Sequence, residues 1–331
     1  MQIAFLGDVM LGRLVNERLK TAAQAYPWGD TLPVLRRADL RIANLECVLA
    51  DGGSPEPGKV FTFRSDAKNV RSLVSAQIDL VSLANNHVLD YGPEALREML
   101  PALDRHGIMH AGAGTDLASA RRPAILRAAA TAVGFVAFTD NQPDWEAAPG
   151  SPGVYYVPVP DRGERTGERA GERAGELLGL LERTKAQVQL LVVSAHWGGN
   201  WGSDVPPGHR ALARRMVDAG ADVVFGHSPH IFRGVEVYRG RPIIYGAGDF
   251  VDDYAVDPEE RNDLSFIFLL EADGGTSIRL RLFPTVIADF QARLAVRNAR
   301  AIAARMSRLC LELGAASSWN AGERCLEIPL A

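Results

Sequence analysis

The sequence of 331 residues predicts a protein of the α/β class. Strand-like apolar runs alternate along the chain with stretches whose apolar residues recur at helical spacing. In addition, five of the apolar runs end in side chains of the kinds that bind metal ions. Ligands of α/β proteins gather at the carboxyl ends of strands, so we expect these five segments to meet at one edge of the fold.

Two helices and a group of later strands can be placed on the sequence. Residues 93–106 begin with Pro93 and keep apolar residues at helical spacing, and residues 208–219 show the same spacing. Residues 234–286 contain closely spaced strand-like runs joined by Gly-rich turns, which predicts a more antiparallel second half. The Ala- and Arg-rich tail 290–313 predicts a packing helix.

The domain organisation expected from these patterns is simple. We predict one domain over residues 1–290, followed by a C-terminal packing helix and strand over 291–331. The low-complexity stretch 163–176, GERTGERAGERAGE, carries balanced Glu and Arg and few groups that can be buried. It predicts either a solvated insertion loop or the start of the helix that reaches Lys185.

Composition excludes several classes of partner. The chain is 47% hydrophobic and 23% charged with a formal net charge of −4, which argues against nucleic acid or an anionic membrane as the main partner. Cys47, Cys310 and Cys325 lack metal-ligand or redox spacing, which is typical of a reducing compartment. The first strand begins at residue 2 and no apolar run approaches about 18 residues. We therefore expect a cytoplasmic protein without a membrane anchor in this chain.

The side chains that follow the five apolar runs have the chemistry of a mixed oxygen and nitrogen metal site. Such sites suit Zn²⁺, Mn²⁺ or Fe²⁺ better than Ca²⁺, which prefers oxygen ligands alone. Six ligands are too many for one tetrahedral ion, but they suit two divalent ions that share a carboxylate and activate a water molecule. The candidate ligands are Asp8, Glu46, Asn86, His196, His227 and His230.

Five ordered motifs give the chain a family resemblance. GDVMLGR, NLE, LANNHVLDYG, SAHWG and GHSPH resemble, in order and spacing, the bacterial poly-γ-glutamate capsule-synthesis proteins of the CapA type, from residue 3 to about 270. That group belongs to the calcineurin-like metallophosphoesterase superfamily. The resemblance implies a four-layer α/β/β/α sandwich with a dimetal centre. The chain departs from the superfamily pattern at Met10, where the first motif normally has His, and in the three-residue spacing of its last two histidines.

The resemblance also implies a role for each motif residue. Asp8 and His230 would bind one metal ion and Glu46 would bridge the two ions. Asn86, His196 and His227 would bind the second ion. His87 would donate a proton to the leaving group.

Other residues near the motifs have two readings each. Arg13 is either a clamp for an anionic group or an ordinary surface arginine. Asp90 either orients His87 or caps the helix that begins near Pro93. Three further residues are predicted to contact substrate, although Asp249 and Asp253 also fit a solvated acidic loop; they are Asn85, Asp249 and Asp253.

These expectations lead to a metal-dependent hydrolase that acts on a small anionic or γ-glutamyl-type substrate. The preferred reaction is attack of metal-activated water on a phosphoester, with His87 as general acid and Arg13 positioning the anion. Two alternatives use the same site. In the first, the site acts on a γ-glutamyl amide bond or serves capsule synthesis. In the second, the protein binds a ligand there without catalysis. Nucleotide-binding folds are excluded, because Gly112 and Gly114 lack the third glycine of a dinucleotide loop and no P-loop is present.

Overall fold

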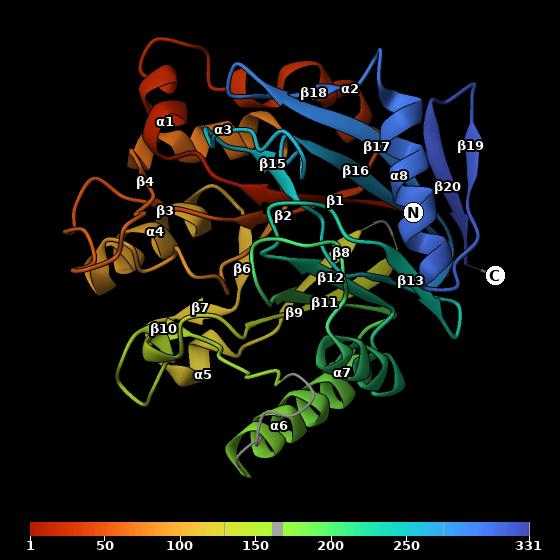
Figure 1. The fold of residues 1–331 in the computed structure, drawn as a ribbon. Coiled ribbons are helices and arrows are strands. Elements are labelled where there is room, and N and C mark those ends of the chain that lie inside the picture. The colour runs from red at the N-terminus through yellow and green to blue at the C-terminus, as the bar shows by residue number, and fades with distance from the viewer. Residues whose placement is uncertain (129, 161–167, 274, 331) are drawn as a thin grey trace.

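The computed structural model describes residues 1–128, 130–160, 168–273 and 275–330, and it contains two large sheets packed face to face (Figure 1). One sheet has ten strands and the other has six. The larger sheet runs in the order β19 (Ser318–Asn320), β20 (Cys325–Pro329), β17 (Thr276–Ala288), β16 (Leu264–Asp273), β1 (Gln2–Val9), β2 (Leu40–Leu45), β5 (Leu80–Ser82) and β6 (Met109–Ala111), with β15 (Asp249–Val251) paired to β1 and β18 (Gln291–Leu294) paired to β17.

The smaller sheet supplies the other half of the sandwich. Its order is β13 (Val235–Tyr238), β14 (Arg241–Ile244), β12 (Val223–His227), β11 (Leu190–His196), β9 (Thr131–Thr139) and β8 (Ala124–Ala128). In both sheets the central strands are parallel: β1, β2, β5 and β6 in one, and β9, β11, β12 and β14 in the other. The carboxyl ends of the parallel strands carry the five motif segments. Two short pairs complete the strands, β3 (Val48–Leu49) with β4 (Arg64–Ser65) and β7 (Ala113–Gly114) with β10 (Gly153–Val154).

Helices cover the outer face of each sheet. The large sheet is covered by α1 (Arg13–Leu19), α2 (Leu32–Leu35), α3 (Val70–Ser75) and α4 (Gly92–Arg105). The small sheet is covered by α6 (Glu168–Lys185) and α7 (Pro207–Asp218), with α5 (Leu117–Ala120) beside them. In the described part of the chain, the connections contain three short 3-10 turns, which are η1 (Tyr26–Thr31), η2 (Ala67–Asn69) and η3 (Pro143–Trp145).

Alternation along the strands produces three hydrophobic layers. In β1, Ile3 and Phe5 face the small sheet, whereas Ala4 and Leu6 face the outer helices, because successive strand residues point to opposite faces. The rings of Phe5 and Phe225 join the two sheets with their centroids 5.2 Å apart. Both sheets are therefore buried on both faces, which is the arrangement expected for central parallel strands. The predicted four-layer α/β/β/α sandwich is confirmed.

The predicted helices at 93–106 and 208–219 correspond to α4 and α7. In the second half, β13 pairs with β14 and β16 with β17 in antiparallel fashion, as expected, while β14 joins β12 in parallel. The low-complexity stretch forms part of α6 from residue 168 onward, and its residues 163–167 lie outside the described residues.

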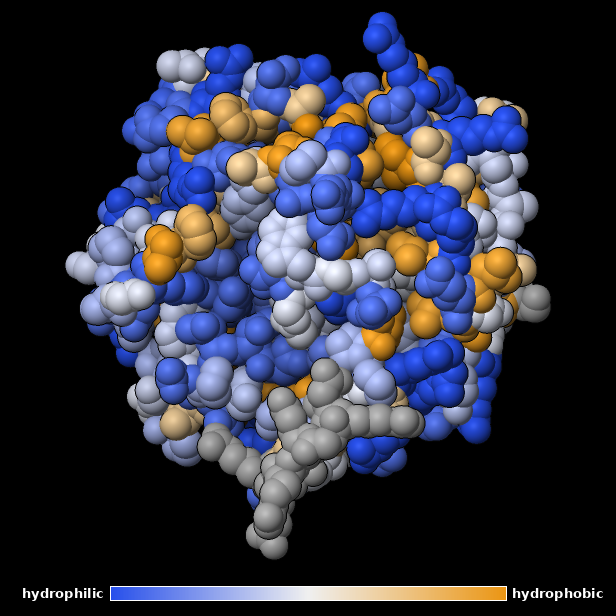
Figure 2. Space-filling view, in the orientation of Figure 1, coloured by the Kyte–Doolittle hydropathy of each residue, from blue (hydrophilic) through white to orange (hydrophobic). Residues whose placement is uncertain are grey.

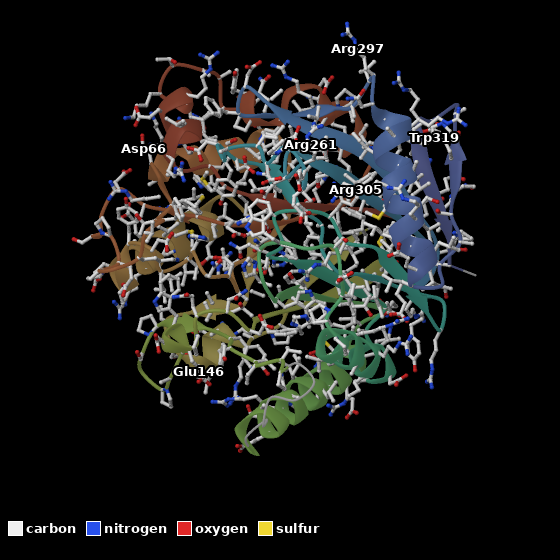
Figure 3. All side chains as sticks on the ribbon, viewed as in Figure 1. Asp66, Glu146, Arg261, Arg297, Arg305 and Trp319 are labelled. Carbon is white, nitrogen blue, oxygen red and sulfur yellow. The ribbon has the colours of Figure 1, made fainter. Side chains whose placement is uncertain are left out.

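The expected helix beginning at residue 290 starts later. Asp289 and Phe290 take positive φ values of 53° and 61° and turn the chain back, so that β18 pairs with β17. The helix α8 runs from Ala299 to Glu312 and inserts Ile302 and Met306 into the core between the sheets. Arg305 of α8, labelled in Figure 3, donates to the Glu260 carbonyl at 2.8 Å. The C-terminal segment thus adds strands to the large sheet and closes one end of the inner core.

On the face shown in Figure 2, hydrophilic residues predominate and hydrophobic ones are interspersed among them. In the part of the chain that the structure describes, none of the helices combines the length and the apolar composition that crossing a bilayer requires.

A close approach of two backbones fixes the edge at which the motifs meet. A Cβ atom at Gly7 would lie 1.8 Å from the Gly248 carbonyl oxygen, which accepts a hydrogen bond from the Asp8 amide at 3.0 Å. We expect Gly7→Ala to lower the free energy of unfolding by about 1–3 kcal/mol, because a methyl group there forces the backbones of β1 and β15 apart. Urea unfolding of the purified protein measures this loss.

Gly171→Ala is the matched control. Gly171 lies in α6 with open space in front of its Cα, so the same methyl group should raise stability by up to about 1 kcal/mol through helix propensity. Equal stability of Gly7→Ala and the wild-type protein would show that the two backbones separate without cost.

Candidate metal centre

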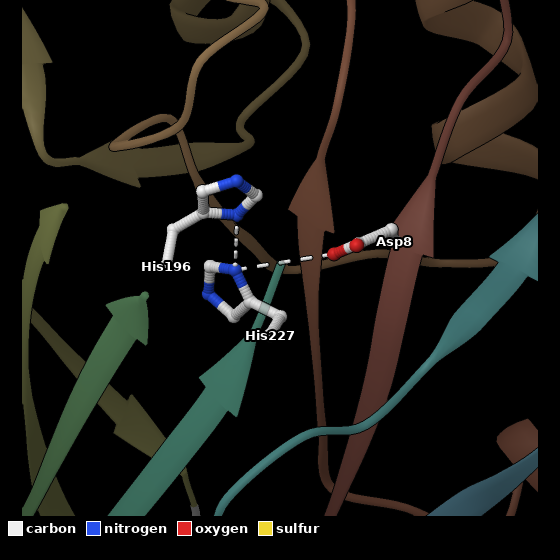
Figure 4. A group of neighbouring side chains, drawn as sticks. All are labelled: Asp8, His196 and His227. Carbon is white, nitrogen blue, oxygen red and sulfur yellow. Dashed lines mark hydrogen bonds and ion pairs between the residues drawn. The ribbon is translucent and has the colours of Figure 1, made fainter. Parts of the chain in front are cut away.

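The carboxyl ends of strands from both sheets meet at one cluster of buried side chains. His196 and His227 end β11 and β12 and are direct partners in the strand register. Asp8, near the end of β1, is paired in register with Asn44 of β2 and with Asp249 of β15. Figure 4 shows Asp8 approaching the two imidazoles from the opposite sheet. The predicted convergence of the motif segments is therefore a property of the strand pairing.

Asp8, His196 and His227 form the first group with metal-binding geometry. Their ligand atoms all lie within 4.8 Å of one another. The Nδ1 atoms of His196 and His227 are 2.9 Å apart, and Nδ1 of His227 is 3.9 Å from Oδ1 of Asp8 (Figure 4). Asn86 joins this group, because its Oδ1 lies 3.0 Å from Nε2 of His196.

Asp8, His230 and Asp249 form the second group, in which Nδ1 of His230 lies 3.0 Å from Oδ1 of Asp249. Asp8 thus belongs to both groups.

Glu46, for which the resemblance implies a bridging role, is in neither group; its Oε2 is 3.7 Å from Nδ1 of His196. Asp249, which we predict from the sequence to contact substrate, is fully buried beside the ligand candidates, and its role stays a prediction.

The cluster has the chemistry of a cation site. Oδ2 of Asp8 and Oδ2 of Asp249 are buried and have no hydrogen-bond partner among the described residues. Burial raises the pKa of Asp8 to about 6, and it raises the pKa values of Glu46 and Asp249 well above their usual range. Burial lowers the pKa of His227 to about 3. Neutral imidazoles beside buried carboxylates are the kind of donor set that a divalent ion requires.

A second set of residues surrounds His87. Nδ1 of His87 lies 2.6 Å from Oδ2 of Asp90, which also accepts a hydrogen bond from the Phe63 amide at 2.6 Å. Because the Asp90 carboxylate accepts the Nδ1 proton, the free nitrogen is Nε2, which lies 4.0 Å from Oε1 of Glu46. Burial lowers the pKa of His87 to about 4. The first turn of α4 has no side-chain cap, so the geometry favours the orienting role for Asp90.

Arg13 faces a pocket of about 470 Å³ beside the cluster, and Asp253 holds it there. The pocket walls include Arg13, Lys59, Phe61, His87, Trp201 and His230. Nε of Arg13 lies 3.2 Å from Oδ2 of Asp253, which also accepts the Leu14 amide at 2.9 Å. The Asp253 side chain is fully buried and fixes the position of Arg13, and its contact with substrate stays a prediction.

Asn85 also lies behind the site. It is fully buried and donates to Oδ1 of Asn44 at 3.1 Å and to the Leu45 carbonyl at 2.8 Å, while its own Oδ1 accepts the His87 amide. The Asn85 amide group thus links the end of β2 to the segment that carries His87, and its contact with substrate stays a prediction.

Three residues take roles that the sequence reasoning did not assign. Asn44 donates to Oδ1 of Asp8 at 2.8 Å and to Oε2 of Glu46 at 2.6 Å, and so holds the two carboxylates together. Lys59 donates to Asp90 and to the Asn86 carbonyl. Met10 is buried with its Sδ accepting the Gly12 amide at 3.0 Å. Asn44 is the first residue of the NLE motif, so the sequence places it near a candidate ligand. Lys59 lies in an irregular segment, where no motif points to a role at the site.

The family model described as bacterial capsule synthesis protein PGA_cap matches residues 2–254. The chain belongs to that family. The matched region contains all the ligand candidates, His87 with Asp90, and the Arg13–Asp253 pair. The resemblance identified from the five motifs is confirmed.

The chain is also similar to curated proteins over much of their length. The chain is 35% identical to a "probable polyglutamine synthesis accessory protein" of Mycobacterium tuberculosis (strain CDC 1551), over 84% of this chain and 74% of the relative. It is 27% identical to the "PGA biosynthesis protein CapA" of Bacillus subtilis (strain 168), over 76% of this chain and 63% of that relative. A solved structure of a hypothetical protein from Thermus thermophilus shares the fold, with a TM-score of 0.50 and 16% identity over 86% of this chain and 98% of the other.

The first prediction for the centre concerns its imidazoles. We expect His196→Ala and His227→Ala each to lower the amount of bound divalent metal at least about tenfold, because loss of one ligand weakens both the charge and the geometry of the group. Metal analysis after dialysis against a fixed Mn²⁺ or Zn²⁺ concentration measures this. The control is His106→Ala, since His106 is exposed at the end of α4. Unchanged metal content in both variants would rule out the ligand assignment.

The second prediction is a pH dependence. In the metal-free protein Asp8 keeps its proton below about pH 6, and burial raises the pKa values of Glu46 and Asp249 well above their usual range, so an incoming ion must displace protons. The imidazoles do not compete, because their pKa values are lowered. Metal affinity should therefore fall about tenfold or more from about pH 7.5 to about pH 5.5, as measured by calorimetric titration. An affinity that stays constant over this range would contradict the raised carboxylate pKa values.

Proposed function

We propose that the protein is a metal-dependent hydrolase that cleaves a phosphoester. The observation that carries this proposal is the buried cluster around Asp8, in which two ligand groups share one carboxylate and the oxygens Oδ2 of Asp8 and Oδ2 of Asp249 lack partners among the described residues. Divalent ions held there would polarise a phosphoryl oxygen and lower the pKa of a water molecule. The mixed oxygen and nitrogen donors favour Mn²⁺, Zn²⁺ or Fe²⁺.

The two groups offer different donors. His196 and His227 supply two nitrogens beside Asp8, with the Asn86 oxygen adjacent, whereas the second group has one nitrogen from His230 and carboxylates from Asp8 and Asp249. We propose one divalent ion for each group. Glu46, tied to Asp8 through Asn44, would complete the coordination of one or both.

Arg13 and Lys59 bring positive charge to the pocket beside the cluster. Nε of Arg13 forms an ion pair with Asp253. The two terminal nitrogens of the guanidinium make no hydrogen bond among the described residues. They can therefore donate as a pair to an anionic oxygen, which is the geometry that guanidinium groups favour for phosphate. The proposed substrate is accordingly a small anion.

His87 is proposed as the proton donor to the leaving group. Its pKa of about 4 means that Nε2 is mostly unprotonated at neutral pH in the substrate-free protein. A phosphate dianion bound beside it would favour the imidazolium, and Asp90 would stabilise that charge through the Nδ1 proton. His87 would then take a proton from solvent when substrate binds and pass it from Nε2 to the departing oxygen.

A second candidate function follows from the names of the relatives. Because those relatives are described by PGA biosynthesis or polyglutamine synthesis, we propose chemistry on a γ-glutamyl amide bond, or a part in capsule synthesis, as the alternative use of the same cluster. The word "accessory" in one of these names also favours a protein that binds its ligand without turnover.

One experiment separates these functions. Metal-loaded protein is tested against phosphomonoesters, phosphodiesters and γ-glutamyl peptides. Turnover of phosphoesters alone would support the first proposal, and turnover of γ-glutamyl peptides alone would replace it with the second. Bound metal without turnover of any substrate would favour ligand binding.

We predict that His87→Ala keeps its metal and loses turnover. The variant lacks the proton donor but retains every side chain of the two ligand groups, so kcat should fall by about 10²–10⁴-fold. The loss should be smaller for p-nitrophenyl phosphate than for an alkyl phosphate, since the nitrophenolate leaves without a proton. Metal analysis and initial rates on both esters test this. A variant that loses its metal would identify His87 as a ligand.

A further inference from the structure

Aromatic rings line the pocket next to the metal centre in a continuous series. Phe63 stacks on His87 with ring centroids 4.0 Å apart and approaches Tyr254 at 5.7 Å. Tyr254 meets the edge of His230 at 4.9 Å, and His230 meets Trp201 at 5.9 Å. The inner part of this series therefore includes His87, the proposed proton donor, and His230, a candidate metal ligand.

The series continues outward on the other side of the pocket. The guanidinium of Arg13 lies 5.7 Å from the Phe63 ring and 5.9 Å from the Phe61 ring. Phe61 comes from the segment between β3 and β4, and Trp201 comes from the segment between β11 and α7. The two outermost rings thus belong to opposite halves of the sandwich and meet the same pocket.

Exposure distinguishes these two rings from the others. Phe61 is 60% exposed and Trp201 is 49% exposed. Every other Phe or Trp among the described residues is buried or half-buried. Burying apolar surface contributes about 25 cal/mol per Å² of favourable free energy. The two exposed rings at the pocket mouth do not have this contribution in the free protein, and a ligand that covers them would supply it.

We propose that the substrate carries a planar aromatic group next to its anion, and that Phe61 and Trp201 select it. The inference rests on the proposed hydrolase function of the same pocket. Arg13 and Lys59 would hold the anion at the metal centre, and the planar group would extend outward against the two exposed rings. A pocket of about 470 Å³ is large enough for an anion with one such substituent. Aromatic pairs gain from stacking beyond the area that they bury, which an aliphatic substituent does not.

The test compares two phosphomonoesters that differ in one property. Benzyl phosphate and cyclohexylmethyl phosphate both carry a six-membered ring on a primary alcohol, so their leaving groups are similar, but only the benzyl ring is planar and aromatic. We expect kcat/KM for the benzyl ester to be about 3- to 10-fold higher in the metal-loaded protein, mainly through KM. Phe61→Leu and Trp201→Leu should each reduce this ratio, and together they should bring it near one.

Two controls isolate the contribution of the rings. Trp201→Phe keeps an aromatic face and should retain most of the preference, whereas Leu311→Ala removes an exposed apolar side chain of α8, 71% exposed, and should leave the ratio unchanged. A wild-type ratio near one, a preference for the cyclohexyl ester, or a ratio insensitive to the double leucine variant would overturn the proposal.

A binding measurement keeps the two proposals separate. Calorimetric titration with benzylphosphonate and cyclohexylmethylphosphonate gives the same comparison without turnover. If the protein binds metal but hydrolyses neither ester, the hydrolase proposal fails, while tighter binding of benzylphosphonate would still support aromatic selection. Equal affinity for both phosphonates would overturn it.

Discussion

The concentration of acidic side chains inside the sandwich is the constraint on which the rest of the site depends. Asp8, Glu46, Asp249 and Asp252 are all buried, and burial raises the pKa of each. Buried carboxylates that are close neighbours cannot all ionise unless a cation lies among them. The strand ends, the close backbone contact at Gly7 and the hydrogen bonds of Asn44 serve to hold these groups together against their repulsion.

Much of this arrangement could be predicted from the sequence. Asp8, His196 and His227 stand at the ends of long apolar runs, and the carboxyl ends of parallel strands meet at one edge. Asp249 was harder to assign, because β15 has only three residues and its pairing with β1 joins segments far apart in the sequence. Lys59 and Asp253 act through contacts that no local pattern encodes. The start of α8 was missed because Asp289 and Phe290, neither of which is glycine, form the tight turn.

The departure at Met10 is explained by its surroundings. Its side chain is buried and its sulfur accepts a backbone amide two residues along, so it stabilises the turn after β1 instead of facing the ligand groups. The candidate nitrogen ligands come from β11, β12 and the segment after β12. The candidate centre is therefore asymmetric, because the large sheet contributes oxygen atoms and the small sheet contributes nitrogen atoms. Neither sheet alone carries both kinds of candidate donor.

The position of β1 in the middle of the large sheet has a consequence for synthesis. This strand lies between β2 and β16, and its carboxyl end pairs with β15, so two of its three neighbours come from residues 249–273. A chain emerging from the ribosome carries Asp8 first, yet some of the partners that fix this residue arrive only once residue 249 has been made. Pairings of such long sequence separation form slowly because loop closure must precede them. We therefore expect the candidate centre to assemble late, when the two halves of the chain join.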